Sequence, residues 1–291
     1  MMSSVPTVDL PSGIKMPILG FGVFQMNDEE AENSVITALQ TGYRSIDTAA
    51  SYNNEQAVGR AIKKSGIPRN DIFITSKLWI ADASYQKAKQ AYQTSLDKLG
   101  LEYLDLYLIH QPFGDIFGAW KALLELYQEG KIRAIGVSNF NAAKLTNFIM
   151  TNRKILNVDI IPMINQIETN PFNQEVDTRK VMKEYNIAHE GWAPFAEGQH
   201  EIFSNSVLDQ IAKKYNKSIS QVVLRWHVQS GVIAIPKSTH QERIAENFDI
   251  FDFELTSDDM LKITELDTNQ SLVDHENPAF VNRLFDRIPS N

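Results

Sequence analysis

The runs IFITSK (Ile72–Lys77) and LDLYLIH (Leu104–His110) are short and contain mainly β-branched, aromatic or other apolar residues, which predicts two buried β-strands. Between them, apolar residues recur at helical spacing over Tyr85–Leu99. A helix that connects two strands buried on both faces is typical of a parallel sheet. The stretch from residue 72 to residue 110 therefore predicts a strand, a helix and a parallel strand in succession.

This alternation continues along the whole chain. The eight predicted strands are Pro17–Phe24, Arg44–Thr48, Ile72–Lys77, Leu104–His110, Ile132–Ser138, Ile160–Gln166, Ile187–Ala193 and Val232–Pro236. Helical spacing also occurs over Glu29–Gln40, Ala119–Glu129, Ala142–Met150, Val176–Tyr185 and Ser220–Gln229. Eight such units predict an α/β fold, a single (β/α)8 TIM barrel with its active site at the C-terminal ends of the strands. After the eighth unit come a helix, Asp258–Leu266, and a tail, 271–291, and we expect this C-terminal loop to lie over the barrel mouth.

The composition limits the class of protein. The chain has 291 residues, of which 43% are hydrophobic, and no linker-like segment interrupts it, so we expect one domain over residues 1–291. No apolar run approaches the roughly 20 residues of a membrane-spanning helix, and Met1–Leu10 lacks the pattern of a signal peptide, which predicts a cytoplasmic protein. The chain has no cysteine, which excludes disulfides, thiolate nucleophiles and cysteine-ligated metals. Any redox chemistry must then use a borrowed cofactor.

The net charge of −8 argues against a general partner of nucleic acids or anionic membranes, because such binding relies on a positive surface field. An anionic ligand would need a local cluster of cations. No heptad pattern or obvious exposed apolar patch indicates an oligomer.

Ionisable residues interrupt the apolar strands at their ends. Asp47 ends the second strand, Lys77 the third and His110 the fourth, and Tyr52 follows in the loop after Asp47. Each has a simpler interpretation, since a strand-end Asp often caps a helix, a Lys is usually solvated and a His commonly makes one local hydrogen bond. Together, at the mouth of one barrel, they indicate a reaction site.

A phenol has an ordinary pKa near 10, and an adjacent ammonium group lowers that value. We therefore expect Lys77 to lower the pKa of Tyr52, Asp47 to hold Lys77 charged, and His110 to bond the substrate oxygen. A positioned acid beside a hydride donor is what carbonyl reduction requires. Hydrolysis fits less well, because no activated Ser or Cys nucleophile and no metal-ligand cluster is visible in the sequence.

A lone GxG pattern, Gly20-Phe21-Gly22, lies within the first predicted strand, Pro17–Phe24. The third glycine of a dinucleotide-binding turn is missing, with Gln25 in its place, so we reject that interpretation. We expect these glycines to let the end of the first strand approach a ligand.

Several motifs together resemble the aldo-keto reductase superfamily over nearly the whole chain. The run Gly42–Ala49, followed by Tyr52, Asn54, Glu55 and Gly59, is similar to the first family signature, and Lys77 and His110 match two further family positions. The resemblance implies that Asp47, Tyr52, Lys77 and His110 are catalytic. It implies NADPH-dependent reduction of small aldehydes, ketones or dicarbonyls, with hydride from the nicotinamide and a proton from Tyr52.

The resemblance also implies where NADPH binds. Ser138, Asn139 and Gln166 can donate to and accept from a carboxamide, although Ser-Asn before a helix is also an ordinary cap. Lys237 and Arg243 supply cations for the phosphate of NADPH, which favours NADPH over NADH. The full set of cofactor positions implied is Val23, Ser138, Asn139, Gln166, Trp192, Ala193, Pro194, Phe195, Lys237, Ser238, Thr239, Arg243, Glu246 and Asn247, the last two for the adenine.

Trp192 stands where many members have a tyrosine that stacks on the nicotinamide, and this variation resembles the bacterial and yeast-like branch of the 2,5-diketo-gluconate reductase or methylglyoxal reductase type. Phe24, Trp79 and Phe113 are expected as apolar walls of the substrate pocket beside His110, although each could instead pack in the core. Relatives suggest a monomer. Two other functions stay open: an NADPH-binding regulatory subunit with little turnover, and a barrel hydrolase.

Overall fold

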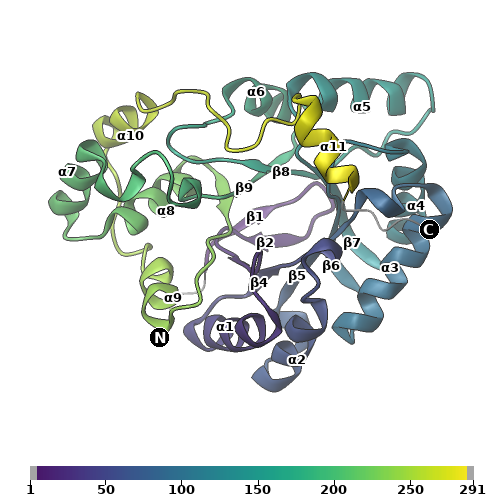
Figure 1. Ribbon diagram of the computed structural model, residues 1–291, viewed down its shortest axis with the longest axis horizontal. Helices are drawn as coiled ribbons and strands as arrows, with labels where there is room; N and C mark the ends of the chain where they lie inside the picture. The colour runs from purple at the N-terminus through teal and green to yellow at the C-terminus, as the bar shows by residue number, and fades with distance from the viewer. Residues whose placement is uncertain (1–4, 287–291) are drawn as a thin grey trace.

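The computed structural model describes residues 5–286, and its centre is a ring of eight parallel strands surrounded by helices (Figure 1). The strands are β1 (Thr7–Asp9), β2 (Lys15–Pro17), β3 (Phe21–Gly22), β4 (Ser45–Asp47), β5 (Phe73–Leu78), β6 (Leu104–Ile109), β7 (Ile132–Ser138), β8 (Ile164–Glu168), β9 (Ala188–Trp192) and β10 (Val232–Ala234). The helices are α1 (Asp28–Thr41), α2 (Glu55–Ser65), α3 (Tyr85–Leu99), α4 (Ile116–Gln128), α5 (Ala142–Lys154), α6 (Val176–Glu184), α7 (Ser206–Tyr215), α8 (Ile219–Gln229), α9 (Gln241–Phe248), α10 (Ser257–Thr264) and α11 (Pro278–Asp286). One short 3-10 turn, η1 (Ala50–Tyr52), is important for the site.

The strands β3 to β10 lie side by side in chain order, each parallel to the next. The ring closes where Leu19 pairs in parallel with Ala234. Here the Gly20 amide donates to the Ala234 carbonyl over 2.9 Å, and the Ala234 amide donates to the Ile18 carbonyl over 3.0 Å. The prediction of a (β/α)8 barrel is confirmed.

The glycines of the GxG pattern serve this closure. A Cβ at Gly20 would lie 3.1 Å from the Ile235 side chain, and a Cβ at Gly22 would lie 3.2 Å from the Ile235 carbonyl oxygen. The strand that follows α8 therefore occupies the space beside both glycines. That the end of the first strand also approaches a ligand stays a prediction.

The strands are apolar because both of their faces are covered. Every residue of β5 and β6 is buried, and the apolar side chains of the ring belong to one continuous core. Several helices begin at a residue whose side chain caps the first turn. Asn27 caps α1 through the Glu30 amide, and Ser218 caps α8 through the Gln221 amide, each as a reciprocal capping box.

Some boundaries differ from the sequence prediction. The first predicted strand, Pro17–Phe24, is hydrogen-bonded as a strand of the ring only at Phe21–Gly22, while Lys15–Pro17 forms an antiparallel hairpin with Thr7–Asp9. The helix α4 begins at Ile116, three residues earlier than predicted, because the Asp115 carboxylate accepts from the Gly118 amide over 2.8 Å. The helices α2, α7, α9 and α11 and the hairpin were not predicted as elements with bounds.

The C-terminal segment lies over the mouth of the barrel. The Glu168 carboxylate, at the C-terminal end of β8, accepts from the Ser271 hydroxyl over 2.6 Å and from the Leu272 amide over 2.8 Å. Further along, the Phe285 ring of α11 lies 6.4 Å from the Phe113 ring, between centroids. In Figure 1, α11 lies at the upper right of the ring, on the side of α4 and α5. The part of the predicted tail beyond residue 286 lies outside the described residues.

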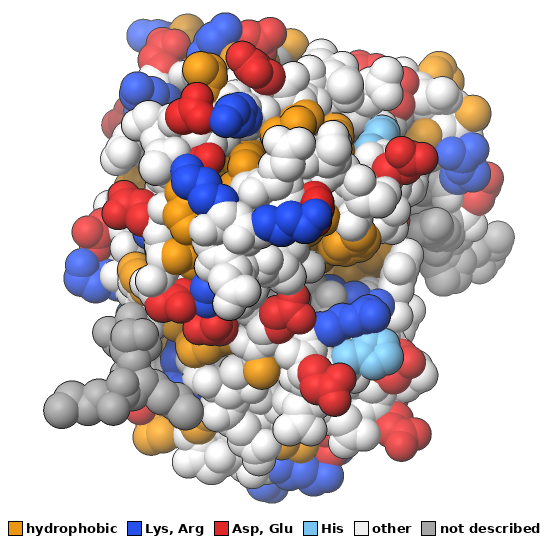
Figure 2. Space-filling view, turned by 90° about the vertical axis from the view of Figure 1, so that its left-hand side faces the viewer, with side chains coloured by type: hydrophobic (Ala, Val, Ile, Leu, Met, Phe, Trp, Pro, Cys, Tyr) orange, Lys and Arg blue, Asp and Glu red, His pale blue; other side chains and the backbone are white. Residues whose placement is uncertain are grey.

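The surface carries charges of both signs. Figure 2 shows the side of the molecule on which α7 and α10 lie, and there Lys and Arg side chains alternate with Asp and Glu. Within residues 5–286, no helix has the length and apolar character needed to cross a bilayer. In the same range no cluster of three His, Asp or Glu side chains has the arrangement of a metal site.

Candidate active site

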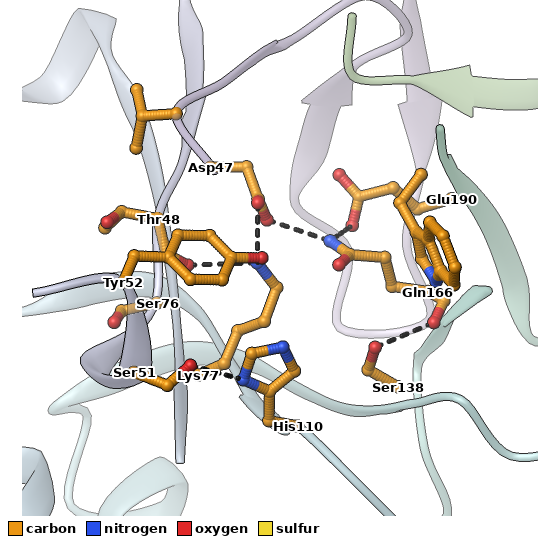
Figure 3. Close-up of polar contacts among 12 residues, drawn as sticks. Asp47, Thr48, Ser51, Tyr52, Ser76, Lys77, His110, Ser138, Gln166 and Glu190 are labelled. Atoms are coloured by element: carbon orange, nitrogen blue, oxygen red, sulfur yellow. Dashed lines mark hydrogen bonds and ion pairs between the residues drawn. The ribbon is translucent and has the colours of Figure 1, made fainter. Parts of the chain in front are cut away.

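Lys77, Asp47 and Tyr52 meet at the C-terminal end of the barrel (Figure 3). The Lys77 ammonium nitrogen lies 2.5 Å from Asp47 Oδ1 and 3.1 Å from the Tyr52 hydroxyl oxygen. A third hydrogen bond, 3.0 Å long, joins it to the Thr48 carbonyl. Lys77 has no exposed surface, so all three donors of its ammonium group are directed to these partners.

The barrel itself positions these groups. Asp47 is the last residue of β4 and Lys77 lies on the neighbouring strand β5, so both side chains reach the mouth from adjacent strands. Tyr52 ends the turn η1 directly after β4. The buried Asn54 side chain holds this turn, because it accepts from the Thr48 hydroxyl over 2.9 Å and donates to the Val23 carbonyl over 2.9 Å. The end of β4 and the turn η1, which Asn54 holds by hydrogen bonds, thus place the Tyr52 phenol at the barrel mouth.

The electrostatics of Tyr52 differ from the sequence prediction. Burial raises the pKa of the phenol above its ordinary value, Lys77 acts to lower it, and Asp47 acts to raise it. Lys77 lowers the pKa as expected, but burial has the larger effect, so the net shift of the Tyr52 pKa is upward. Sequence reasoning had counted the ammonium but not the loss of water around the phenol. A phenol with a raised pKa keeps its proton at neutral pH, as a proton donor must.

His110 follows β6 directly, and its ring lies 5.7 Å from the Tyr52 ring and 5.4 Å from the Trp79 ring, between centroids. Burial lowers the pKa of His110 well below its ordinary value, with Lys77 and His275 acting in the same direction. The imidazole is therefore neutral at pH 7. Its Nδ1 lies 3.4 Å from the Ser51 hydroxyl, which leaves Nε2 for a substrate.

The predicted nicotinamide residues form one network at the ends of β7, β8 and β9. The Asn139 amide nitrogen donates to the His110 carbonyl over 2.9 Å, and Asn139 Oδ1 accepts from the Trp192 indole over 3.0 Å. The Ser138 hydroxyl donates to the backbone carbonyl of Gln166 over 2.8 Å. Asn139 has a φ of 64°, in the left-handed region, which asparagine tolerates better than most residues. These contacts bring together four residues that the sequence predicted separately.

A second group of predicted cofactor residues follows β10 and continues into α9. Lys237, Thr239 and Arg243 are exposed, whereas Ser238 and Asn247 are buried and Glu246 is half-buried. Among residues 5–286, neither Lys237 nor Arg243 makes an ion pair with a carboxylate. Two uncompensated cations beside hydroxyl groups suit a phosphate in an otherwise acidic protein.

The remaining predicted cofactor positions lie near the same end of the ring. Val23 is buried just after β3, and its amide donates to the Asp47 carbonyl over 3.2 Å. The run Ala193–Phe195 leaves the end of β9, and Ala193 has a φ of 49°. A positive φ is costly for alanine by about 1 kcal/mol, so the chain turns sharply here under local strain.

The three predicted substrate walls also lie near the acid–base residues. Phe24 is 43% exposed, and its ring packs 4.9 Å from the Tyr52 ring, between centroids. Trp79 contacts His110, and Phe113 contacts Phe285 of the C-terminal segment, as described above. All three are incompletely buried, which is consistent with a place on a pocket wall rather than in the core.

Sequence reasoning missed one buried carboxyl group, Glu190 of β9. It has no exposed surface and accepts a hydrogen bond from the Gln166 amide nitrogen over 2.8 Å. It also missed Ser51, which contacts His110, and it named Asn54 only as part of the family signature, without its role in holding the Tyr52 turn. The signal that found Asp47, an ionisable residue within an apolar strand, is present at Glu190 as well.

The aldo/keto reductase family profile matches residues 18–268. The chain belongs to the aldo/keto reductase family. It is 48% identical to the glyoxal reductase of Bacillus subtilis over 266 residues, which cover 91% of this chain and 94% of that protein. It is 42% identical to the methylglyoxal reductase DkgA of Escherichia coli K12 over 274 residues, 93% of this chain and 97% of that one.

A solved structure supports the same assignment. The aldo-keto reductase of Bombyx mori, crystallised in complex with NADP, superimposes with a TM-score of 0.86 at 35% identity and covers 94% of this chain and 96% of its own. The predicted family, its bacterial branch and the oxidoreductase class are confirmed. The NADP of the Bombyx mori protein agrees with the cofactor predicted from the sequence.

Proposed function

We propose that this aldo/keto reductase reduces small aldehydes and dicarbonyls such as glyoxal or methylglyoxal with NADPH, and that Tyr52 donates the proton. The observation that carries the proposal is the hydrogen-bonded chain from the Tyr52 phenol through Lys77 to Asp47 at the barrel mouth. The names of the Bacillus subtilis and Escherichia coli relatives support the dicarbonyl class.

In the proposed reaction, Tyr52, Lys77 and Asp47 serve proton transfer, and His110 orients the substrate. Tyr52 keeps its proton at neutral pH because burial raises the pKa of the phenol. As negative charge develops on the substrate oxygen, the phenol hands over its proton, and the neighbouring Lys77 ammonium stabilises the phenolate left behind. Asp47 holds Lys77 in place and balances its charge. His110, neutral at pH 7, donates one hydrogen bond from Nε2 to the same oxygen and sets its angle.

Bound NADPH would supply the hydride. Ser138, Asn139 and Gln166 fit the carboxamide of a nicotinamide, because together they offer a hydroxyl and two amides at the ends of adjacent strands. Lys237 and Arg243 fit the adenosine phosphate, since both are exposed cations. The protein's own contribution is thus binding, orientation and a positioned proton.

Turnover separates this proposal from its alternatives. Purified protein is mixed with NADPH and a panel that includes glyoxal, methylglyoxal and simple monoaldehydes, and the loss of NADPH absorbance is followed. We expect fastest turnover with the small dicarbonyls. Tight NADPH binding without turnover would favour a regulatory subunit, and cofactor-independent hydrolysis would favour a hydrolase. A monomer is also proposed, and light scattering of the purified protein tests it.

A further inference from the structure

Glu190 is a buried carboxyl group that the proposed reaction does not use. It lies in the middle of β9, in register with Gln166 of β8 and with Ile233 of β10. Residues in register on neighbouring parallel strands point to the same face of a sheet, so Glu190 and Gln166 both reach into the barrel. Figure 3 shows Gln166 between Asp47 on one side and Glu190 on the other.

The Gln166 amide nitrogen is fully used by these two carboxyl groups. It donates one hydrogen to Asp47 Oδ2 and the other to Glu190 Oε2, each over 2.8 Å. An amide nitrogen has only two hydrogens, so the carbonyl oxygen Oε1 is the one polar atom of this side chain left for a ligand. Turning the amide over would place Oε1 against Asp47 Oδ2, an oxygen of a carboxylate that cannot donate a hydrogen bond. Asp47 therefore fixes which end of Gln166 is presented, and Glu190 holds the side chain in place by accepting the second amide hydrogen.

We propose that Glu190 is a positioning residue for the cofactor, which acts through Gln166 to hold an acceptor oxygen toward the carboxamide NH2 of the nicotinamide. The inference deepens the proposed function and rests on it, because it assumes that the nicotinamide ring binds beside Gln166. It assigns Glu190 no contact with the cofactor or substrate. It adds Gln166 and Glu190 to the hydrogen-bonded chain that begins at Tyr52.

The charges around Glu190 are consistent with this role. The groups that face it are Asp47 of β4, Lys77 of β5 and the Tyr52 phenol, while β10 contributes only the apolar run Val232–Ala234. Burial, together with Asp47, raises the pKa of Glu190 to about 8, with Gln166 and Lys77 acting in the opposite direction. The carboxyl group is therefore largely neutral at pH 7. A neutral carboxyl still accepts through its carbonyl oxygen, and it does not place a second negative charge beside Asp47.

The two carboxyl oxygens of Glu190 differ in their hydrogen bonding, because within residues 5–286 only Oε2 accepts one. Glu190 Oε1 is buried and has no hydrogen-bond partner among the described residues. A buried polar atom without a partner is costly, so packing alone would favour an apolar residue at this position. The hydrogen bond to Gln166 is the interaction that an apolar side chain could not replace.

The test compares two variants of similar size. Glu190→Gln keeps a carbonyl acceptor for Gln166, whereas Glu190→Met removes it. The dissociation constant of NADPH is measured by quenching of tryptophan fluorescence, and KM and kcat for methylglyoxal are measured separately. We expect Glu190→Met to weaken NADPH binding about tenfold, the value of one neutral hydrogen bond, and Glu190→Gln to stay within about twofold of the parent. KM for the carbonyl substrate should change little in both.

A double-variant cycle shows whether Glu190 acts through Gln166. In a Gln166→Met background, Glu190→Met should cause no further loss of NADPH affinity. Additive losses, or equal losses in Glu190→Gln and Glu190→Met, would overturn the inference. Unfolding midpoints are measured for all variants, and Glu190→Ala replaces Glu190→Met if that variant does not fold. Failure of the parent protein to bind NADPH would instead refute the proposed function, so the two failures are distinguishable.

Discussion

The Lys77 ammonium nitrogen lies 3.1 Å from the Tyr52 hydroxyl, in a place where the lysine side chain meets no solvent. Burial favours the neutral form of Lys77, but Asp47 and Tyr52 outweigh it and hold the pKa of the lysine above its ordinary value. The ammonium is therefore a permanent charge at physiological pH. We propose that it stabilises the Tyr52 phenolate, and its raised pKa keeps it from giving up its own proton in the process.

Tyr52→Phe removes the proposed proton donor and leaves the ring. We expect kcat for methylglyoxal to fall by about 10²–10⁴, the usual contribution of a positioned general acid, with the NADPH dissociation constant unchanged. Tyr103→Phe is the matched control, because the Tyr103 hydroxyl bonds only Asn70 at an exposed position. Steady-state kinetics and fluorescence titration measure both effects. Retention of full activity in Tyr52→Phe would refute the proposed donor.

Lys77→Met leaves the buried Asp47 carboxylate without its ion-pair partner. Breaking one side of a buried pair typically costs about 3–5 kcal/mol of the free energy of unfolding, because an uncompensated charge stays behind. The double variant Asp47→Leu/Lys77→Met should recover most of that loss, although it should be inactive. Urea unfolding of the two variants measures the difference. Equal destabilisation in both would show that the ion pair is not the cause.

Lys237→Ala should weaken NADPH much more than NADH, since only NADPH carries the additional phosphate. A hydrogen bond to a charged group contributes about 1.5–3 kcal/mol, which corresponds to a roughly 10- to 100-fold rise in the dissociation constant of NADPH. Lys262→Ala, which removes an exposed lysine paired with Asp258 on α10, is the control. Parallel losses for both cofactors would remove the phosphate assignment from Lys237.

The stability of the fold should fall as the pH drops below about 6.5. Burial lowers the pKa of His189 well below its ordinary value. Below about pH 6.5 the imidazole is therefore protonated in the unfolded chain but still neutral in the folded chain. The stability that this residue contributes is present above the unfolded pKa and is lost as the pH falls toward 5, by up to about 2 kcal/mol. His189→Gln should show a smaller loss of unfolding free energy between pH 7 and pH 5. An unchanged pH dependence would mean that other groups dominate.

Glu168→Ala should release the C-terminal segment from the barrel mouth. The carboxylate accepts from Ser271 and Leu272, and alanine offers neither bond an acceptor. We expect faster amide hydrogen exchange over residues 270–286, with kcat for methylglyoxal within about twofold of the parent. Exchange measured by mass spectrometry at the same pH tests this. Unchanged exchange in that segment would show that contacts such as Phe113 with Phe285 suffice to hold it.

The acid–base residues were predictable because each interrupts an apolar strand or follows one. Asp47, Lys77 and His110 are polar where burial would favour an apolar side chain, and strand ends of a parallel barrel converge on one mouth. The same signal is present at Glu190, an ionisable residue in the strand that also carries Trp192. The direction of the Tyr52 pKa shift was not predictable, since it depends on how deeply the phenol is buried and not on which residue is next to it.

Contacts between distant parts of the chain were the least predictable. Glu168 and Ser271 are 103 residues apart, and no periodic pattern relates them. The closing pair Leu19 and Ala234 was implied by the barrel but not by either residue. Helix α2 was not predicted, although its buried face carries apolar residues such as Val58, Ala61 and Ile62. The pattern of apolar residues along the sequence predicts which residues are buried. The folded structure is needed to show which residues they pack against.

The hydrogen-bonded chain from Tyr52 to Glu190 spans β4, β5, β8 and β9, and therefore joins residues from both halves of the polypeptide. A nascent chain that has emerged only through residue 110 already carries Asp47, Tyr52, Lys77 and His110, but Gln166, the other side-chain partner of Asp47, has yet to be synthesised. We expect such a truncated product to be inert. Catalytic competence then appears late, when the ring is completed, and enzyme activity becomes a direct reporter of successful folding.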